Sequence, residues 1–118
     1  MADAEENGLT IADDASLLIV DDEINLRLQL AKAMDRRGFQ TDVAESVAEG
    51  IRAVEARPPK YAVIDLRLDD GSGLDVVETL RRVRPDARIV VLTGYGNIAT
   101  AVAAVKAGAV DYLPKPAD

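Results

Sequence analysis

The sequence predicts an α/β protein with a doubly wound, parallel sheet of five strands. Short apolar runs, such as Leu17–Val20 and Ile89–Leu92, alternate with longer stretches in which apolar residues recur at helical spacing. A strand that helices cover on both faces reads as a continuous apolar run rather than as an alternating one. A strand and a helix follow each other four times before a fifth strand, and this order favours a parallel sheet between two layers of helices.

The first strand, Leu17–Val20, leads into a predicted helix. Apolar residues recur at helical spacing from Ile24 to Met34. Two arginines and then Gly38 supply the last-turn cations and the glycine that commonly end a helix. Phe39–Ala44 predicts a second strand, of the kind found at the edge of a sheet.

The second helix begins with a recognisable start signal. Ser46 and Glu49 fit a capping box, in which the two side chains satisfy free N–H groups at the start of a helix. This helix is expected to run to about Ala56, where two prolines soon end it. Tyr61–Ile64 is then a third apolar strand, and it runs directly into Asp65.

Four further elements follow a predicted turn at residues 68–73. They are a helix at 74–83 that is stopped by Pro85, a strand at Ile89–Leu92, an alanine-rich helix at 97–107 and a short strand at 110–113.

The composition limits what this chain can do. Its 118 residues suit one domain with a real core, which we place at residues 16–118 behind an acidic N-terminal tail at residues 1–15. The net charge of −7 disfavours direct binding to nucleic acid, which needs clustered cations. The lack of cysteine and histidine excludes disulfides, thiolate metal sites and histidine catalysis. The absence of a long apolar run and of a signal-peptide pattern predicts a cytoplasmic protein with no membrane partner.

Polar side chains follow four of the five strands at the point where each apolar run ends. Asp21 and Asp22 follow the first strand, Asp65 the third, Thr93 the fourth and Lys115 the fifth. In the strand order 2-1-3-4-5, the first and third strands are neighbours at the point where the order reverses, and ligands bind outside the carboxyl ends of the strands there. We therefore expect the three aspartates to converge in one pocket, with Thr93 and Lys115 beside it.

This set of side chains suits a metal and a phosphoryl group. Converging carboxylates repel one another, and a hard divalent cation relieves that repulsion. Oxygen ligands with retained waters suit Mg²⁺. An aspartate in such a site can also act as a nucleophile that accepts a phosphoryl group. The metal, the Lys115 ammonium and the Thr93 hydroxyl would then stabilise the charge on that group.

Each of these residues also has an ordinary structural interpretation. Asp21 or Asp22 can cap the following helix, and Asp65 can be a turn residue. Thr93 can merely end a strand, and Lys115 can be a solvated surface lysine. The hypothesis of a site therefore rests on the combination, because all four strand ends carry a suitable side chain in the required order.

Three motifs, VDDE, LTGYG and DYLPKP, and the position of Asp65 after a strand resemble the receiver domain of bacterial two-component response regulators over residues 16–116. Longer stretches, such as AVIDLRLDDGSGLDVVETLR, resemble more narrowly the RegA/PrrA/ActR redox-response regulators of alphaproteobacteria. The resemblance implies a flavodoxin-like (CheY-like) fold. Receivers normally continue with one more helix after the KP pair, so this domain is expected to lack its last helix and to carry no effector domain.

The resemblance implies a role for each acidic residue. Asp65 is the expected phosphoacceptor. Asp22 and Asp65 would ligate Mg²⁺ directly, together with the backbone carbonyl of Arg67, and Asp21 would act through a water molecule.

Three more residues would respond to phosphorylation, as the same resemblance implies. Lys115 would pair with the phosphate, aimed by a cis bond to Pro116. Thr93 is the expected switch hydroxyl, and Tyr112 is the expected switch aromatic. Thr93 would move toward the phosphate and Tyr112 would turn inward into the space it leaves, which shifts a pre-existing equilibrium between two conformations.

The resemblance therefore implies a signalling receiver and not an enzyme that turns over an external substrate. A sensor histidine kinase is the expected donor, transfer to Asp65 would be self-catalysed, and slow autodephosphorylation would reverse it. A homodimer is expected on phosphorylation, through the face formed by the helix at 97–107 and the strand at 110–113. Control of transcription would pass through a C-terminal helix-turn-helix domain outside these residues, which is the only expected route to DNA.

Two other functions stay open on the sequence alone. An aspartyl-phosphate enzyme resembling the haloacid dehalogenase phosphatases also uses strand-end aspartates with Mg²⁺. Such enzymes have the motif Asp-x-Asp after the first strand. This chain has Asp21, Asp22 and Glu23 there, so the second aspartate of that motif is missing. A flavodoxin-like cofactor binder is the other alternative, although three acids in the pocket oppose the phosphate of FMN. Turnover of a generic phosphate ester would identify the first, and a coloured purified protein the second.

Overall fold

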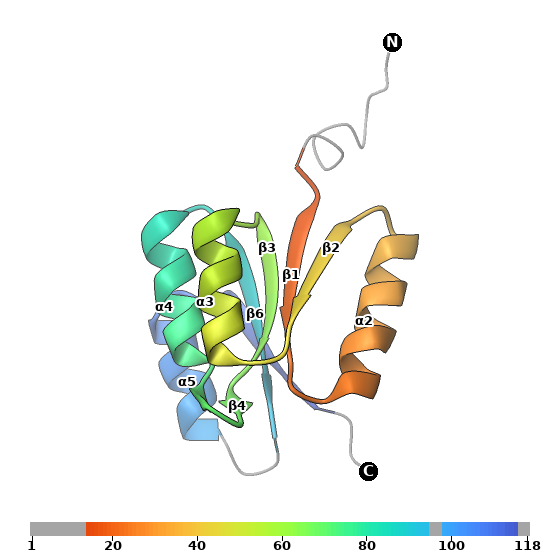
Figure 1. Ribbon diagram of the computed structural model, residues 1–118. Coiled ribbons are helices and arrows are strands. Elements are labelled where there is room, and N and C mark those ends of the chain that lie inside the picture. Colours follow the sequence, from red (N-terminus) through yellow and green to blue (C-terminus); the bar gives the residue numbers. More distant parts are fainter. Residues whose placement is uncertain (1–13, 95–97, 116–118) are drawn as a thin grey trace.

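A computed structural model describes residues 14–94 and 98–115, which form a five-stranded parallel sheet with helices on both faces (Figure 1). The strand order is β2-β1-β3-β6-β7, which confirms the predicted order 2-1-3-4-5 when the strands of this sheet are counted along the chain. The strands are β1 (Ser16–Val20), β2 (Gln40–Ala44), β3 (Tyr61–Asp65), β6 (Arg88–Thr93) and β7 (Asp111–Pro114). The helices are α2 (Ile24–Arg36), α3 (Val47–Ala56), α4 (Leu74–Val83) and α5 (Ile98–Lys106).

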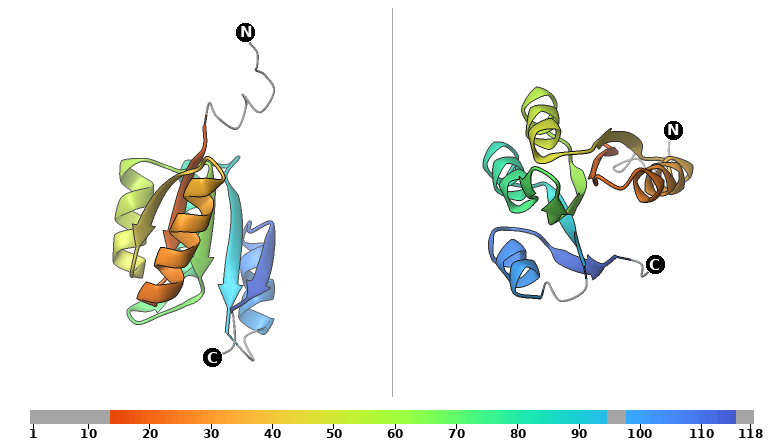
Figure 2. Two further views of the ribbon diagram at one scale, coloured as in Figure 1. Left: turned by 90° about the vertical axis from the view of Figure 1, so that its right-hand side faces the viewer. Right: turned by 60° about the horizontal axis from the view of Figure 1, so that its bottom comes forward.

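Three helices lie on one face of the sheet and α2 lies on the other (Figure 1, Figure 2). The face toward α3, α4 and α5 holds the main core, in which Leu18 and Ile64 of the strands pack with Val54 and Leu80 of the helices. Burying a side chain of this size stabilises the fold by about 1.5–3 kcal/mol. On the opposite face α2 has no fully buried side chain, and Leu113 of β7 is 52% exposed. This second face is therefore the less completely covered one.

Between β3 and α4 the chain forms a small hairpin where the sequence predicts only a turn. β4 (Arg67–Leu68) pairs antiparallel with β5 (Gly71–Ser72), so Arg67 lies opposite Ser72 and Leu68 opposite Gly71. Leu68 is buried and joins the main core. The sequence pattern does not reveal this hairpin, because a strand of two residues is too short to show a periodicity.

The start of α3 confirms one half of the predicted capping box. The Ser46 Oγ accepts a hydrogen bond from the Glu49 N–H at 3.1 Å. The carboxylate of Glu49 accepts from the N–H of Glu45, also at 3.1 Å, and not from the N–H of Ser46. The returning bond therefore closes one residue earlier than the motif predicts.

Some expectations fall on residues that the structure does not describe. The helix predicted at 97–107 is observed as α5, with Asn97 outside the described residues. Pro116, for which the cis bond is expected, and residues 1–13 of the predicted tail also lie outside them. Within the described ranges, no helix combines the length and the apolar character needed to cross a membrane.

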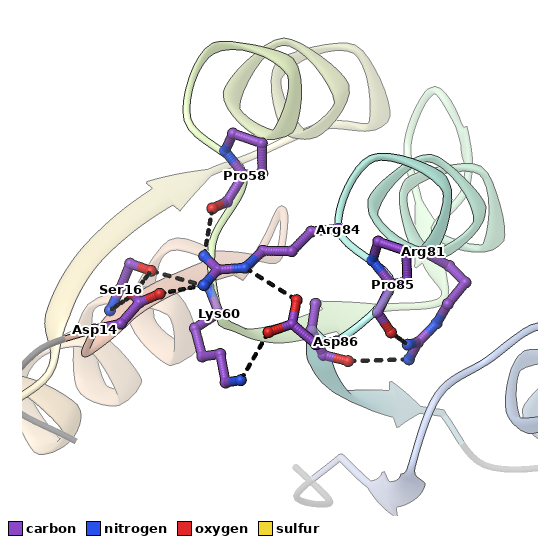
Figure 3. Close-up of polar contacts among 9 residues, drawn as sticks. Asp14, Ser16, Pro58, Lys60, Arg81, Arg84, Pro85 and Asp86 are labelled. Atoms are coloured by element: carbon purple, nitrogen blue, oxygen red, sulfur yellow. Dashed lines mark hydrogen bonds and ion pairs between the residues drawn. The ribbon is translucent and has the colours of Figure 1, made fainter. Parts of the chain in front are cut away.

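At the amino ends of the strands, Arg84 ties together segments that are distant in sequence (Figure 3). Arg84 follows the last turn of α4 and donates to the carboxylate of Asp14, to the backbone oxygen of Pro58 at 2.9 Å and to Asp86 at 3.4 Å. Asp14 also accepts a hydrogen bond from Ser16 Oγ at 2.7 Å. The residues just before β1 are therefore bound to the α3–β3 and α4–β6 connections.

The Asp14 contacts predict a specific pH dependence of stability. Hydrogen bonds from Ser16 and Arg84 hold the pKa of Asp14 below its ordinary value. A carboxyl with a depressed folded-state pKa contributes stability above its unfolded pKa of about 3.9, and the contribution is lost as the pH falls through the lower folded value. We expect Asp14→Asn to be less stable than the wild type near neutral pH and to lose less stability on acidification, as measured by urea unfolding at a series of pH values.

Asp42→Asn is the matched control for this prediction. Asp42 pairs with Arg57 at 2.8 Å, but the two side chains are 58% and 79% exposed, and such surface pairs contribute little. The Asp42→Asn profile should follow the wild type. Parallel profiles for Asp14→Asn and the wild type would show that the Asp14 contacts contribute nothing to acid stability.

Candidate metal centre

Three carboxylates meet at the carboxyl ends of β1 and β3. Asp21 and Asp22 directly follow β1, and Asp65 is the last residue of β3. The two strands are paired in register, with Val20 opposite Ile64. One oxygen from each of the three aspartates lies within 4.8 Å of the other two. The predicted convergence of the three acids is therefore confirmed, and it follows directly from the parallel pairing of the strands.

Asp21 carries the clearest sign that the pocket suits a cation. Its side chain is 0% exposed, and its Oδ1 accepts hydrogen bonds from the Glu23 N–H at 2.9 Å and from Lys115 Nζ at 3.4 Å. Among the described residues, its Oδ2 has no hydrogen-bond partner although it is buried. A buried acceptor without a donor is costly, and a hard cation would satisfy it. The residues present therefore fit a divalent metal.

The helix-cap interpretation of the first two aspartates is not supported. The N-cap residue of α2 is Glu23, and no side chain forms a capping bond there. Asp21 accepts instead from the N–H of Glu23, before the first helical residue. Asp22 is half-buried and directs a carboxylate oxygen toward the cluster.

Lys115 provides the positive charge of the site. Its Nζ lies 3.0 Å from Asp65 Oδ2 and 3.8 Å from Glu23 Oε1. Burial acts to lower the pKa of Lys115, but Asp65 and Asp21 outweigh it and raise the pKa, so the side chain stays an ammonium. Burial also raises the pKa of Asp65, and hydrogen bonds from Lys115 and from the Arg67 N–H offset only part of that rise.

The backbone around Asp65 is closely packed, and Gly73 is a residue that the sequence analysis did not assign to the site. The Gly73 N–H donates to the backbone oxygen of Leu66 at 3.0 Å. A β-carbon at Gly73 would lie 2.1 Å from the backbone oxygen of Asp65 and 2.9 Å from Ile64 Cγ2. Only glycine fits against the end of β3 here. The glycine-rich sequence at residues 71–73, in and directly after β5, was the available signal, but such glycines equally mark a turn.

Thr93 and Tyr112 lie on neighbouring strands beside the acids. Thr93 ends β6 and is 5% exposed, and its backbone oxygen accepts from the Lys115 N–H at 2.7 Å. Tyr112 is half-buried, packs against the main core and lies opposite Val91 in the β6–β7 register. Because side chains alternate along a strand, Thr93 and Tyr112 project from the same face of the sheet.

The sequence profile described as the response regulator receiver domain matches residues 17–118. The chain belongs to this family. The fold agrees, since a crystal structure of a CheY-like response regulator receiver domain protein from Methanospirillum hungatei JF-1 aligns with a TM-score of 0.79 at 28% identity, covering 89% of this chain and 84% of that one. Membership in the receiver family decides against the haloacid dehalogenase-like and flavin-binding alternatives.

The receiver is similar to curated regulators of alphaproteobacterial type, as the sequence motifs predict. It is 66% identical over 113 residues to the photosynthetic apparatus regulatory protein RegA of Rhodovulum sulfidophilum, covering 96% of this chain and 62% of RegA. It is also 66% identical over 108 residues to the acid tolerance regulatory protein ActR of Rhizobium meliloti (strain 1021), covering 92% of this chain and 56% of ActR. The chain thus spans less than two thirds of the length of these relatives.

One solved receiver-containing structure bears on the metal. A response regulator protein from Burkholderia pseudomallei, crystallised with a phosphorylated aspartic acid, calcium ion and citrate, aligns with a TM-score of 0.81 at 42% identity, covering 89% of this chain and 62% of that one. Receiver domains bind a divalent metal at an acidic pocket, and in this chain the corresponding acids are Asp21, Asp22 and Asp65.

The contact at Gly73 predicts that a single methyl group will damage the receiver. Gly73→Ala places its β-carbon against the Asp65 carbonyl, so we expect a loss of about 2 kcal/mol or more in the free energy of unfolding. Gly38→Ala is the control, because its β-carbon meets nothing within 4 Å and only the backbone φ of +96° opposes it. That strain costs about 1 kcal/mol. Equal losses in urea unfolding would show that the segment next to Asp65 relaxes to accept a side chain.

Proposed function

We propose that this receiver accepts a phosphoryl group on Asp65 from the phosphohistidine of a sensor histidine kinase, with Mg²⁺ as the cofactor. The observation that carries the proposal is the position of Asp65. Its side chain is 2% exposed at the end of β3, and its carboxylate shares a pocket with two other acids and lies 3.0 Å from the Lys115 ammonium. The similarity to a regulator crystallised with a phosphorylated aspartic acid supports the same conclusion.

The metal in this proposal is held by Asp22, by Asp65 and by the backbone carbonyl of Arg67, with Asp21 acting through a water molecule. The convergence of the three acids and the unpartnered Oδ2 of Asp21 support this ligand set. When bound, Mg²⁺ neutralises the repulsion between the carboxylates and the charge on phosphoryl oxygens.

The residues of the chain perform the transfer by position and charge. An oxygen of Asp65 forms a bond to phosphorus as the phosphorus–nitrogen bond to the donor histidine breaks, and the released imidazole nitrogen takes up a proton from solvent. The Lys115 ammonium, now bound to Asp65 and Asp21, is placed to pair with the phosphoryl oxygens. The Thr93 hydroxyl lies at the end of the next strand along the sheet and serves as a further donor.

The conformational response to phosphorylation then involves β6 and β7, which carry Thr93 and Tyr112. Thr93 moves toward the phosphate, and Tyr112, which is half-buried on the same face of the sheet, turns inward to fill the space. This shifts a pre-existing equilibrium toward the active conformation and changes the surface of α5 and β7. The receiver is a switch in this scheme, and slow hydrolysis of its own acyl phosphate resets it.

The deciding experiment is the intact mass of the protein after incubation with acetyl phosphate and Mg²⁺. We expect the wild type to gain one phosphoryl group, only when Mg²⁺ is present, and Asp65→Ala to gain none because the nucleophile is removed. Asp42→Asn, which removes a carboxylate far from the pocket at the surface of β2, should behave as the wild type. A phosphoryl gain in Asp65→Ala, or no gain in a folded wild type, would contradict the proposal.

The active form is proposed to be a homodimer that contacts its partner through α5 and β7. The apolar side chains Val102, Val105 and Val110 on or beside these elements are 42%, 39% and 47% exposed, which favours a second copy as the occupant of this face. The dimer would control a C-terminal helix-turn-helix domain that binds DNA, which is the output expected of RegA-like and ActR-like regulatory proteins.

A charge placed on this face should separate dimerisation from phosphorylation. We expect Val105→Asp to take up phosphate normally and to remain monomeric after acetyl phosphate treatment, as measured by analytical ultracentrifugation, because an unpaired charge would be buried in the interface. Leu28→Asp is the control, since Leu28 is similarly exposed at 49% but lies on α2. If Leu28→Asp prevents dimerisation and Val105→Asp does not, the interface lies on the α2 side.

A further inference from the structure

Asp70 lies in the turn of the β4–β5 hairpin and contacts the first turn of α3. Its Oδ1 accepts a hydrogen bond from the Val47 N–H at 2.8 Å, and its Oδ2 accepts one from the Ala48 N–H at 3.1 Å. The third N–H of this turn, that of Glu49, is bound by Ser46. The free N–H groups at the start of α3 are therefore shared between a local cap and a side chain that arrives from the hairpin.

The contact is built to hold the hairpin in one position. Both carboxylate oxygens are used, so the contact constrains the orientation of the turn as well as its distance from α3. The partial positive charge of a helix start favours an anion there, and the two N–H bonds lower the pKa of Asp70 accordingly. A hairpin with two residues in each strand is marginal by itself and depends on such external contacts.

The first residue of the hairpin, Arg67, lies with its backbone next to Asp65, the proposed phosphoacceptor. The Arg67 N–H donates to Asp65 Oδ1 at 3.1 Å, and Arg67 is paired with Ser72 across the hairpin. The same residue supplies the carbonyl ligand in the proposed metal site. The place of this carbonyl therefore depends on how firmly the hairpin is attached to the rest of the domain.

We propose that Asp70 is a positioning residue, which clamps the β4–β5 hairpin to the start of α3 and thereby sets the backbone of Arg67 beside Asp65. This inference rests on the proposed function, because the metal-ligand role of the Arg67 carbonyl belongs to it. Asp70 acts through Arg67 and not on the reacting groups. Groups that hydrogen-bond a metal ligand directly change metal affinity by about 10–100-fold when removed, and Asp70, which acts one step further away through the hairpin, is expected at the lower end of that range.

The test is a titration of the whole chain with Mg²⁺, followed by NMR amide shifts, for the wild type and four variants. We expect the dissociation constant of Asp70→Ala to rise about 10-fold. Asp70→Asn keeps one acceptor oxygen and should show an intermediate loss. Asp69→Ala removes the same charge from the adjacent, exposed position and should leave the affinity unchanged.

Ser46→Ala distinguishes positioning of the site from general fraying of α3. It removes the other cap of the same helical turn without touching the hairpin. We expect it to lower the melting temperature and to leave Mg²⁺ affinity unchanged. A loss of affinity in Ser46→Ala equal to that in Asp70→Ala, or no loss in Asp70→Ala, would overturn the inference.

Amide hydrogen exchange of Arg67, measured without metal, separates this inference from the proposed function. Asp70→Ala should speed the exchange of the Arg67 N–H, whereas Ser46→Ala should not. A wild type that binds no Mg²⁺ would refute the proposed metal chemistry, and the exchange rates would still decide whether Asp70 positions Arg67. Unchanged exchange in Asp70→Ala would refute the clamp itself.

Discussion

The parallel pairing of β1 with β3 is the constraint on which the rest of the site depends. It sets Val20 opposite Ile64 and so brings the next residues of both strands, Asp21 and Asp65, to one place. The apolar strand residues, buried among the helices, stabilise this pairing strongly enough to hold like charges together at its end. The acids converge although their charges repel, because the register of the two hydrophobic strands fixes the positions of the residues at the strand ends.

Lys115 places a positive charge between two of the crowded carboxylates. It comes from the far side of β6, immediately after β7, and reaches both Asp21 and Asp65. The same short strand carries Tyr112, which packs on the core. A change in the partners of Lys115 therefore acts on β7, which also contacts α5. Within the described sheet, β7 pairs only with β6. β7 therefore connects the pocket to the surface formed with α5.

The sequence predicts the parts of the structure that depend on short-range pattern and on strand ends. The alternation of strands and helices follows from the apolar runs, and the order 2-1-3-4-5, taken from doubly wound folds with this alternation, places Asp21, Asp22 and Asp65 together. The contacts of Asp70 with α3 could not be predicted from the sequence. They depend on how a hairpin packs against a helix, and each joins two residues that are separated by more than 20 positions, 23 for Val47 and 22 for Ala48. The close approach at Gly73 was hidden for a related reason, since a glycine required by packing and one required by a turn look the same in sequence.

The two ends of the sheet differ in their balance of charge, and this difference separates stability from function. At the amino ends, Arg84 and Lys60 are matched by Asp14 and Asp86, and Arg81 donates to backbone oxygens such as that of Pro85 (Figure 3). At the carboxyl ends, three aspartates and Glu23 lie near the Lys115 ammonium, and the Arg27 guanidinium donates to the backbone oxygen of Asp21 at 2.8 Å, so acids still outnumber cations. The ion pairs at the amino ends link loop segments to one another and do not require a ligand. The excess of carboxylates favours the binding of a cation, which relieves their mutual repulsion, and the proposed phosphoryl transfer would add its charge beside Lys115.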